Sequence, residues 1–218
     1  MPKRALMEHR PWLLAAIAAA VAFYFLRNYP VPGVQLALLK GAGVAFLGAY
    51  AVHRGSGRDA LILGLVMALS AIGDMAIEFS LEAGGAAFFA SHVAAISLYL
   101  RNPRHHATGS QKALAVALLL GTPLVCWFLS RDVGVTLYGL ALGGMASTAW
   151  MSRFPRYRVG LGAVLFVLSD WLIFSRLGPV DLGGIPDLAI WPLYFAGQFL
   201  IATGVTQVLR HELAEEDD

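Results

Sequence analysis

The chain has 218 residues, of which 58% are hydrophobic and only 14% are charged. A soluble domain would carry about 25% charged residues, so this composition excludes an ordinary soluble domain and predicts a protein whose main solvent is lipid. The formal net charge of +2 gives no indication of nucleic-acid binding, and the single cysteine, Cys126, excludes an intrachain disulfide.

The N-terminal stretch begins with basic residues, continues as an apolar run and ends rich in alanine, which is typical of a signal peptide. Later stretches of the chain are equally apolar. Because a protein with many membrane spans uses its first one as an anchor, we predict that this stretch is retained rather than cleaved.

Eight apolar stretches divide the chain, and each is about 18–20 residues long, enough to cross a bilayer as a helix. They cover approximately residues 11–28, 33–52, 59–78, 84–101, 112–130, 133–151, 159–176 and 188–208. The short gaps at 79–83 and 131–132 predict tight helical hairpins. The sequence thus predicts an all-α polytopic membrane bundle of eight transmembrane helices. We expect one domain over residues 1–210 and an acidic C-terminal tail at 211–218, in which residues 215–218 are solvated and disordered.

The distribution of Lys and Arg residues indicates the orientation of these helices. The terminal segments and the even-numbered loops carry about twelve of them, whereas the odd-numbered loops carry three. Because cytoplasmic loops are enriched in Lys and Arg, we predict that both termini face the cytoplasm. We expect the protein in the bacterial cytoplasmic (inner) membrane, and its oligomeric state stays open.

Two aspartates lie inside these apolar stretches, Asp74 in the third and Asp170 in the seventh. A carboxylate in a membrane helix costs roughly 3 kcal/mol on insertion scales. It normally persists only where it faces other parts of the protein or a water-filled cavity and has a function there. The two aspartates are therefore the main candidates for functional residues.

The predicted topology converts sequence position into depth, at about 1.5 Å per residue. Six polar side chains from five of the predicted helices then fall in the outer half of the membrane: Lys40, Asp74, His92, Asp170, Tyr194 and Gln198. Their common depth predicts one cavity that these side chains line together. Glu78 lies near the outer end of the third stretch, where we expect it to be solvated.

Each of these side chains also has a structural interpretation. Lys40 could extend to the outer interface, and His92 could be a hydrogen-bonded core histidine. Tyr138 and Tyr194 could belong to an aromatic belt, and Gln198 could join two helices by a hydrogen bond. The two aspartates could be buried structural partners of the lysine or the histidine.

Several short motifs occur in a fixed order along the chain. They are GD at 73–74, F-x(3)-H at 88–92, LGA-x(2)-F-x(2)-SD at 161–170 and Y-x(3)-Q at 194–198. In this order, and with eight apolar stretches, the sequence resembles the YhhN-like lysoplasmalogenase family over about residues 12–208. Lys40 corresponds to the family's lysine in the second helix, and Tyr138 and Met145 to its tyrosine and methionine in the sixth. The sequence departs from the family pattern at Gly41, where proline is common, and just after His92, where a tyrosine is frequent.

The resemblance implies hydrolysis of the vinyl ether bond of lysoplasmalogens, which gives a fatty aldehyde and a glycerophospho-alcohol. It also implies a cavity that accepts one long apolar chain, with the polar end at the outer mouth. Vinyl ether hydrolysis needs a general acid, stabilisation of an oxocarbenium ion and a base that activates water. Glycosidases meet similar demands with two carboxyls, so we expect Asp74 and Asp170 to be the catalytic pair, without a cofactor.

The remaining residues are expected to bind the lysophospholipid: Lys40, His92, Tyr138, Tyr194 and Gln198. Lys40 would bind the substrate phosphate, and His92 would orient a carboxylate or relay a proton. A metal site of His92, Asp74 and Asp170 is an alternative, but zinc sites generally use more nitrogen or sulfur ligands, so we expect no metal. A proton-coupled transporter or a lipid-binding membrane protein that uses the same aspartates also stays open.

Overall fold

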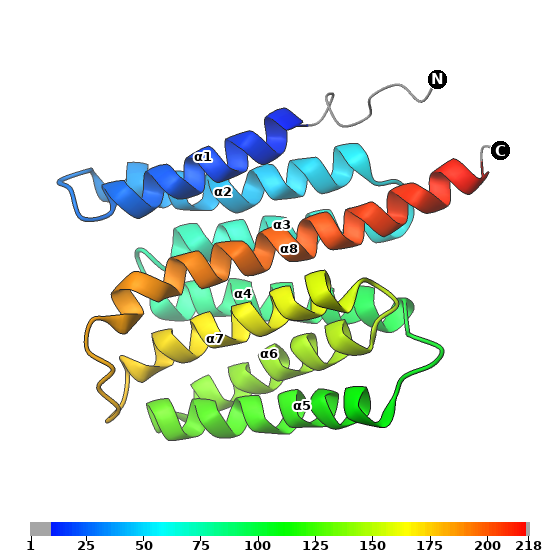
Figure 1. Ribbon diagram of the computed structural model, residues 1–218. Helices are drawn as coiled ribbons and strands as arrows, with labels where there is room; N and C mark the ends of the chain where they lie inside the picture. The colour runs from blue at the N-terminus through cyan, green and yellow to red at the C-terminus, as the bar shows by residue number, and fades with distance from the viewer. Residues whose placement is uncertain (1–9, 217–218) are drawn as a thin grey trace. The chain divides into compact units, whose positions relative to one another are not determined.

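The structure is a computed structural model that describes residues 10–216, and these residues are almost entirely helical (Figure 1). They contain eight α-helices, one π-helical turn and no β-strand; only one isolated bridge, between Pro103 and Ser152, occurs in this part of the chain. The elements are α1 (Arg10–Leu26), α2 (Gly33–Arg54), α3 (Gly57–Ala76), α4 (Leu81–Arg101), α5 (Gly109–Ser130), α6 (Val133–Met151), η1 (Arg156–Gly160), α7 (Leu161–Ser175) and α8 (Ile185–Glu216). Each predicted span therefore corresponds to one α-helix.

Six segments of the described chain are long and apolar enough to cross a membrane. They are α2, α3, α4, α5, η1 together with α7, and α8 as far as Arg210. Helix α1 is apolar but shorter, and α6 is not among the six. Many large apolar side chains are exposed along the helices, such as Leu14, Phe25, Leu61, Phe128 and Leu137. Apolar exposure on this scale is expected of helices that face lipid.

Local signals explain where several helices begin and end. Thr108 forms a capping box with Gln111, so α5 begins a few residues before the predicted start. Asp132 accepts a hydrogen bond from the Val135 amide and caps α6. Arg131, with φ at 56°, ends α5 in the left-handed conformation. These two residues form the whole connection between α5 and α6, as the predicted tight hairpin requires.

Two predicted boundaries differ from the structure. Helix α3 ends at Ala76, so Glu78 lies in the following turn rather than inside the span. Helix α8 continues to Glu216, so it extends through most of the predicted tail, and residues 215–216 are helical rather than disordered. The basic start of the chain and residues 217–218 of the tail lie outside the described residues.

The contacts divide the chain into two compact units. The first unit contains the residues up to Ser91 and those from Val205 onward, and the second contains His92–Gly204. Helices α4 and α8 are each divided between the two units. The single domain expected over residues 1–210 stays a prediction, and the two units are described in turn.

In the first unit, α2 packs against both α1 and α3 (Figure 1). Small residues allow this close approach. A Cβ atom at Gly41 would lie 2.7 Å from the Met75 side chain, and one at Gly48 would lie 3.0 Å from Met67. Packing of this kind is usual between membrane helices, in which glycine lets two backbones approach each other.

In the second unit, α5 and α6 lie side by side, and α7 contacts both (Figure 1). A Cβ atom at Gly143 of α6 would lie 2.6 Å from the Leu118 carbonyl oxygen of α5. One at Gly162 of α7 would lie 2.7 Å from the Gly197 carbonyl oxygen of α8. Helix α7, which carries Asp170, is thus held against a neighbour at backbone distance.

Candidate active site

A chain of two hydrogen bonds connects three helices inside the second unit. The Nε2 atom of His92 on α4 lies 2.9 Å from the Tyr138 hydroxyl on α6. The same hydroxyl donates a hydrogen bond of 2.7 Å to Oδ2 of Asp170 on α7. The structure therefore brings together three of the residues expected from the sequence, and we call them the His92–Tyr138–Asp170 chain.

The two ends of this chain are shielded from solvent. His92 is 1% exposed and Asp170 is 5% exposed, whereas Tyr138 has intermediate exposure. A buried carboxyl needs a hydrogen-bond donor, since an unpaired charge in an apolar environment is strongly destabilising. The Tyr138 hydroxyl supplies that donor to Asp170.

Aromatic rings enclose the polar chain. Phe166 packs edge-on against His92 with ring centroids 5.0 Å apart, and Phe174 packs edge-on against Tyr138 at 5.5 Å. Asp170 lies four residues after Phe166 and four before Phe174, so all three occupy one face of α7. This spacing is visible in the sequence, where Phe166 is the aromatic residue of the LGA-x(2)-F-x(2)-SD motif, but its contact with His92 is not.

Two further site candidates, Tyr194 and Gln198, lie one helical turn apart on α8. The Tyr194 ring packs edge-on against Phe166, with centroids 5.1 Å apart. Gln198 is 1% exposed, and its side-chain amide lies 3.5 Å from the Tyr194 hydroxyl, which makes a weak hydrogen bond. Tyr194 thus reaches the polar chain through Phe166, and Gln198 reaches it through Tyr194.

The other two candidates belong to the first unit. Asp74 is 2% exposed. Lys40 forms an ion pair of 2.7 Å with Glu78, in which the side chains are 16% and 26% exposed. Glu78 is therefore the ion-pair partner of Lys40 and remains accessible to solvent, as the sequence suggested. A cavity lined jointly by these residues and those of the second unit stays a prediction.

The chain matches the YhhN family over residues 35–205, a range that includes all seven candidate residues. The chain belongs to the YhhN family. It is also 31% identical over 179 residues to proteins named lysoplasmalogenase from Mycobacterium bovis and Mycobacterium tuberculosis, and this covers 76% of this chain and 68% of each relative. No solved structure matches the chain significantly.

Membership of the YhhN family confirms the resemblance drawn from the order of the motifs. Together with the six apolar helices, it identifies the chain as an integral membrane protein. The family match begins at residue 35, after α1, so that helix lies outside the matched region. The motif residues His92, Asp170, Tyr194 and Gln198 all lie in the second unit of this YhhN-family chain.

A pocket of about 310 Å³ in the first unit contains none of the candidate residues. Mostly small side chains from α2 and α3 line it: Ala45, Gly48, Ala49, Val52, His53, Gly64 and Ala68. Within the described part of either unit, no three His, Cys, Asp or Glu side chains are grouped so that they could hold a metal ion.

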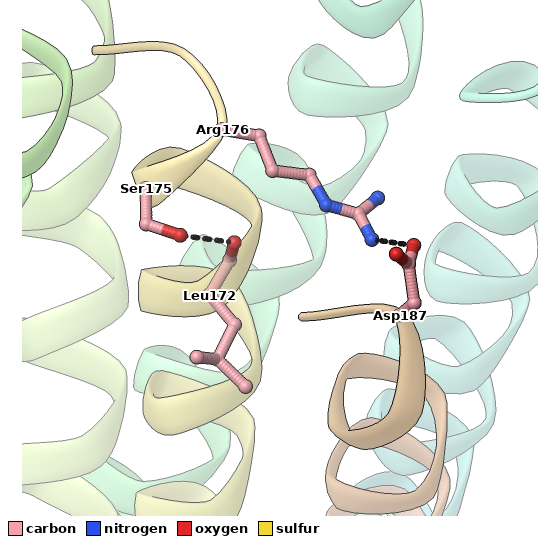
Figure 2. A network of polar contacts seen from close by, with 4 residues as sticks. All are labelled: Leu172, Ser175, Arg176 and Asp187. Atoms are coloured by element: carbon pink, nitrogen blue, oxygen red, sulfur yellow. Dashed lines mark hydrogen bonds and ion pairs between the residues drawn. The ribbon is translucent and has the colours of Figure 1, made fainter. Parts of the chain in front are cut away.

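A second polar network of the second unit lies at the ends of two helices (Figure 2). Arg176, which follows α7, forms an ion pair with Asp187 in the first turn of α8. Figure 2 shows the Arg176 side chain extended toward α8, while Ser175 donates a hydrogen bond of 2.8 Å to the Leu172 carbonyl. This network joins the two ends of the α7–α8 connection.

Proposed function

We propose that this YhhN-family protein is an integral membrane hydrolase that cleaves the vinyl ether bond of lysoplasmalogen-type lysophospholipids. The products are a fatty aldehyde and a glycerophospho-alcohol. The observation that carries the proposal is the His92–Tyr138–Asp170 chain, in which a buried carboxyl is linked through a phenol to an imidazole. The name lysoplasmalogenase of two relatives supports the choice of substrate.

The chemistry requires two proton transfers at different atoms. An acid first protonates the outer carbon of the vinyl ether, which leaves an oxocarbenium ion. Water then adds to the cationic carbon and gives up a proton to a base, and the resulting hemiacetal collapses to the aldehyde and the alcohol. We assign these steps to Asp74 and Asp170, one as acid and the other as base, by analogy with the carboxyl pairs of glycosidases.

The other candidate residues bind the substrate in this proposal. Lys40 pairs with the substrate phosphate and exchanges Glu78 for it, because an ammonium group binds either anion. Tyr194 and Gln198 contact the polar end of the substrate, and Tyr138 and His92 line the reacting end, where they act through Asp170. The fatty chain lies against apolar side chains of the membrane helices.

The proposal includes a topology. All eight helices cross the membrane, both termini face the cytoplasm, and the protein resides in the bacterial cytoplasmic membrane. The support is the bias of about twelve Lys and Arg residues to three between the two sets of loops. Helices α1 and α6 cross with the others in this topology. Successive basic segments are then separated by two spans each, so all of them lie on the same side of the membrane.

The test is mass spectrometry of products after purified protein in detergent is incubated with a 1-alkenyl lysophospholipid. The 1-alkyl analogue is the matched control substrate, since its saturated ether has no double bond that accepts a proton. We expect aldehyde and glycerophospho-alcohol in equal amounts from the alkenyl lipid and neither from the alkyl lipid. An Asp170→Asn preparation purified in the same way should release little aldehyde, which excludes a contaminating enzyme.

Two outcomes would contradict the proposed hydrolase. If the detergent-solubilised protein releases no aldehyde but sealed vesicles accumulate substrate in response to a proton gradient, the protein is a transporter. If it retains the lipid unchanged under both conditions, it is a lipid-binding protein.

A further inference from the structure

The Tyr138 hydroxyl stands between two partners but carries only one proton. It lies 2.9 Å from Nε2 of His92 and 2.7 Å from Oδ2 of Asp170. A phenol can donate one hydrogen bond, so one of its two partners must donate to it. Either His92 donates while Tyr138 donates to an ionised Asp170, or a protonated Asp170 donates while Tyr138 donates to His92.

These two arrangements differ only in the location of protons. For the two arrangements to hold the same number of protons, both ring nitrogens of His92 carry a proton in the first and the Asp170 carboxyl is ionised. Conversion to the second breaks the Nε2–H bond of His92 and the O–H bond of Tyr138, and it forms one O–H bond on Tyr138 and one on Asp170. The number of bonds and the total charge are conserved, and no heavy atom needs to move over distances of 2.9 and 2.7 Å.

We propose that Tyr138 is a positioning residue that passes a proton from His92 to Asp170 and so supplies Asp170 with the proton that it donates during turnover. This assignment rests on the proposed hydrolysis. The Tyr138 proton moves to Asp170, His92 replaces it on Tyr138, and Asp170 then gives its proton to the substrate carbon. With Asp170 as the acid, Asp74 is the base that takes the proton of the added water, so one proton is given to the substrate and one is recovered from water in each cycle.

The surroundings favour this direct route over one through solvent. His92 and Asp170 are 1% and 5% exposed, so bulk water has little access to either end of the chain. Phe166 packs edge-on against His92, and Phe174 packs edge-on against Tyr138, which limits reorientation of both rings. Each of the three polar residues also comes from a different helix, so the chain forms only in the folded unit.

A tyrosine whose hydroxyl kept one fixed orientation would leave His92 insensitive to the state of Asp170. The proposal predicts instead that Asp170 influences the His92 ring, although no direct hydrogen bond links them. This influence is measured by NMR of protein labelled with ¹⁵N in its histidine rings, with a His92→Gln variant to assign the signals. We expect Asp170→Asn to shift the His92 ring nitrogens in the wild-type background and to have no effect in a Tyr138→Phe background.

Turnover provides the second measurement. We expect Tyr138→Phe to lower kcat by about 10–100-fold with little change in KM, somewhat less than loss of a general acid itself. The Tyr138→Phe/Asp170→Asn double variant should be no slower than Asp170→Asn alone, because Tyr138 acts through Asp170. Tyr99→Phe is the matched control: Tyr99 is a buried tyrosine of α4 in contact with Phe154, and its loss of a hydroxyl should leave kcat unchanged.

The results separate this proposal from the proposed function. If Asp170→Asn leaves the His92 signals unchanged, or shifts them equally in both backgrounds, the relay is wrong whatever the reaction is. If the NMR coupling is present but wild-type protein releases no aldehyde, the proposed hydrolysis fails and the proton route stands. Should Tyr138→Phe not fold, 3,5-difluorotyrosine placed at position 138 keeps both hydrogen bonds while it changes the acidity of the phenol. The relay then predicts altered kcat and shifted His92 signals, and unchanged values of both would overturn it.

Discussion

Two polar networks of the second unit each contain an aspartate but differ in solvent exposure and in the charge of its partner. The Arg176–Asp187 ion pair at the ends of α7 and α8 joins two full charges, but its side chains are 46% and 73% exposed. In the His92–Tyr138–Asp170 chain, the terminal residues are 1% and 5% exposed, and the link between them is a neutral phenol.

The difference leads us to expect that burial, rather than formal charge, decides which of the two contacts contributes more to stability and activity. An exposed ion pair contributes roughly 0–1 kcal/mol, because water solvates both charges nearly as well when they are apart. Inside an apolar environment, an aspartate without a partner is strongly destabilised, so each member of a buried network depends on the others. We therefore expect substitutions in the buried chain to have larger effects than substitutions in the exposed pair.

The largest expected effect on turnover comes from replacing the aspartate of the buried network by asparagine, compared with the same replacement in the exposed network. Asp170→Asn should lower turnover by about 10²–10⁴-fold, because the amide keeps the size of the side chain but exchanges no proton. Asp187→Asn is the matched control, and we expect its turnover to stay within about twofold of wild type. Steady-state kinetics on samples with equal amounts of folded protein measure both. Similar losses in the two variants would remove the functional distinction between the networks.

The close contact between α7 and α8 beside the buried chain should tolerate no added side-chain atoms. Gly162→Ala should destabilise the protein by roughly 1–3 kcal/mol, because the new methyl would lie 2.7 Å from the Gly197 carbonyl oxygen. Gly121→Ala on α5 is the control, because a Cβ atom there meets nothing within 4 Å. Thermal unfolding in detergent should separate the two variants, and equal midpoints would show that the close α7–α8 approach is not required.

The Lys40–Glu78 ion pair is an intermediate case, with side chains 16% and 26% exposed. If Lys40 binds the substrate phosphate, Lys40→Gln should raise KM by about 10-fold, equivalent to about 1.4 kcal/mol of binding free energy. Glu78→Gln should lower KM or leave it unchanged, because it removes the competing anion. Substrate titrations of both variants test this difference in sign. An equal rise of KM in both would identify the ion pair as a structural contact.

The smallest effect is expected at the exposed network. Arg176→Gln should change the free energy of unfolding by less than about 1 kcal/mol, and raising the ionic strength should reduce the difference further. Unfolding midpoints of wild type and variant at low and high salt measure it. A loss of stability as large as that of Gly162→Ala would show that exposed charges matter as much as buried packing in this protein.

Most of the fold could be predicted because apolar runs and their interruptions are local properties of a sequence. The eight predicted stretches correspond to α1–α8, and the α5–α6 hairpin follows from a connection of two residues, Arg131 and Asp132. The end of α3 and the length of α8 differ from the prediction, because polar residues such as Glu78 and Glu216 do not by themselves specify where a helix ends.

The site was only partly predictable, for a related reason. Asp170 could be identified from the cost of a carboxylate in an apolar stretch, which needs no knowledge of its neighbours. Its hydrogen bond to Tyr138 joins residues 32 positions apart, and the contact of Tyr138 with His92 spans 46. Lys40 and Glu78 are likewise 38 positions apart. Partners at such separations are determined by the packing of helices, which periodicity and composition do not specify.

The central claim is that Asp74 and Asp170 act together as acid and base. Its most direct test is the turnover of Asp74→Asn, Asp170→Asn and the double variant, each normalised to the amount of folded protein. We predict that each single substitution lowers kcat by about 10²–10⁴-fold. The double substitution should then cost much less than the product of the two, because residues that act as a unit are not additive. Near-normal turnover in both well-folded single variants would contradict the claim that these carboxyls perform the hydrolysis.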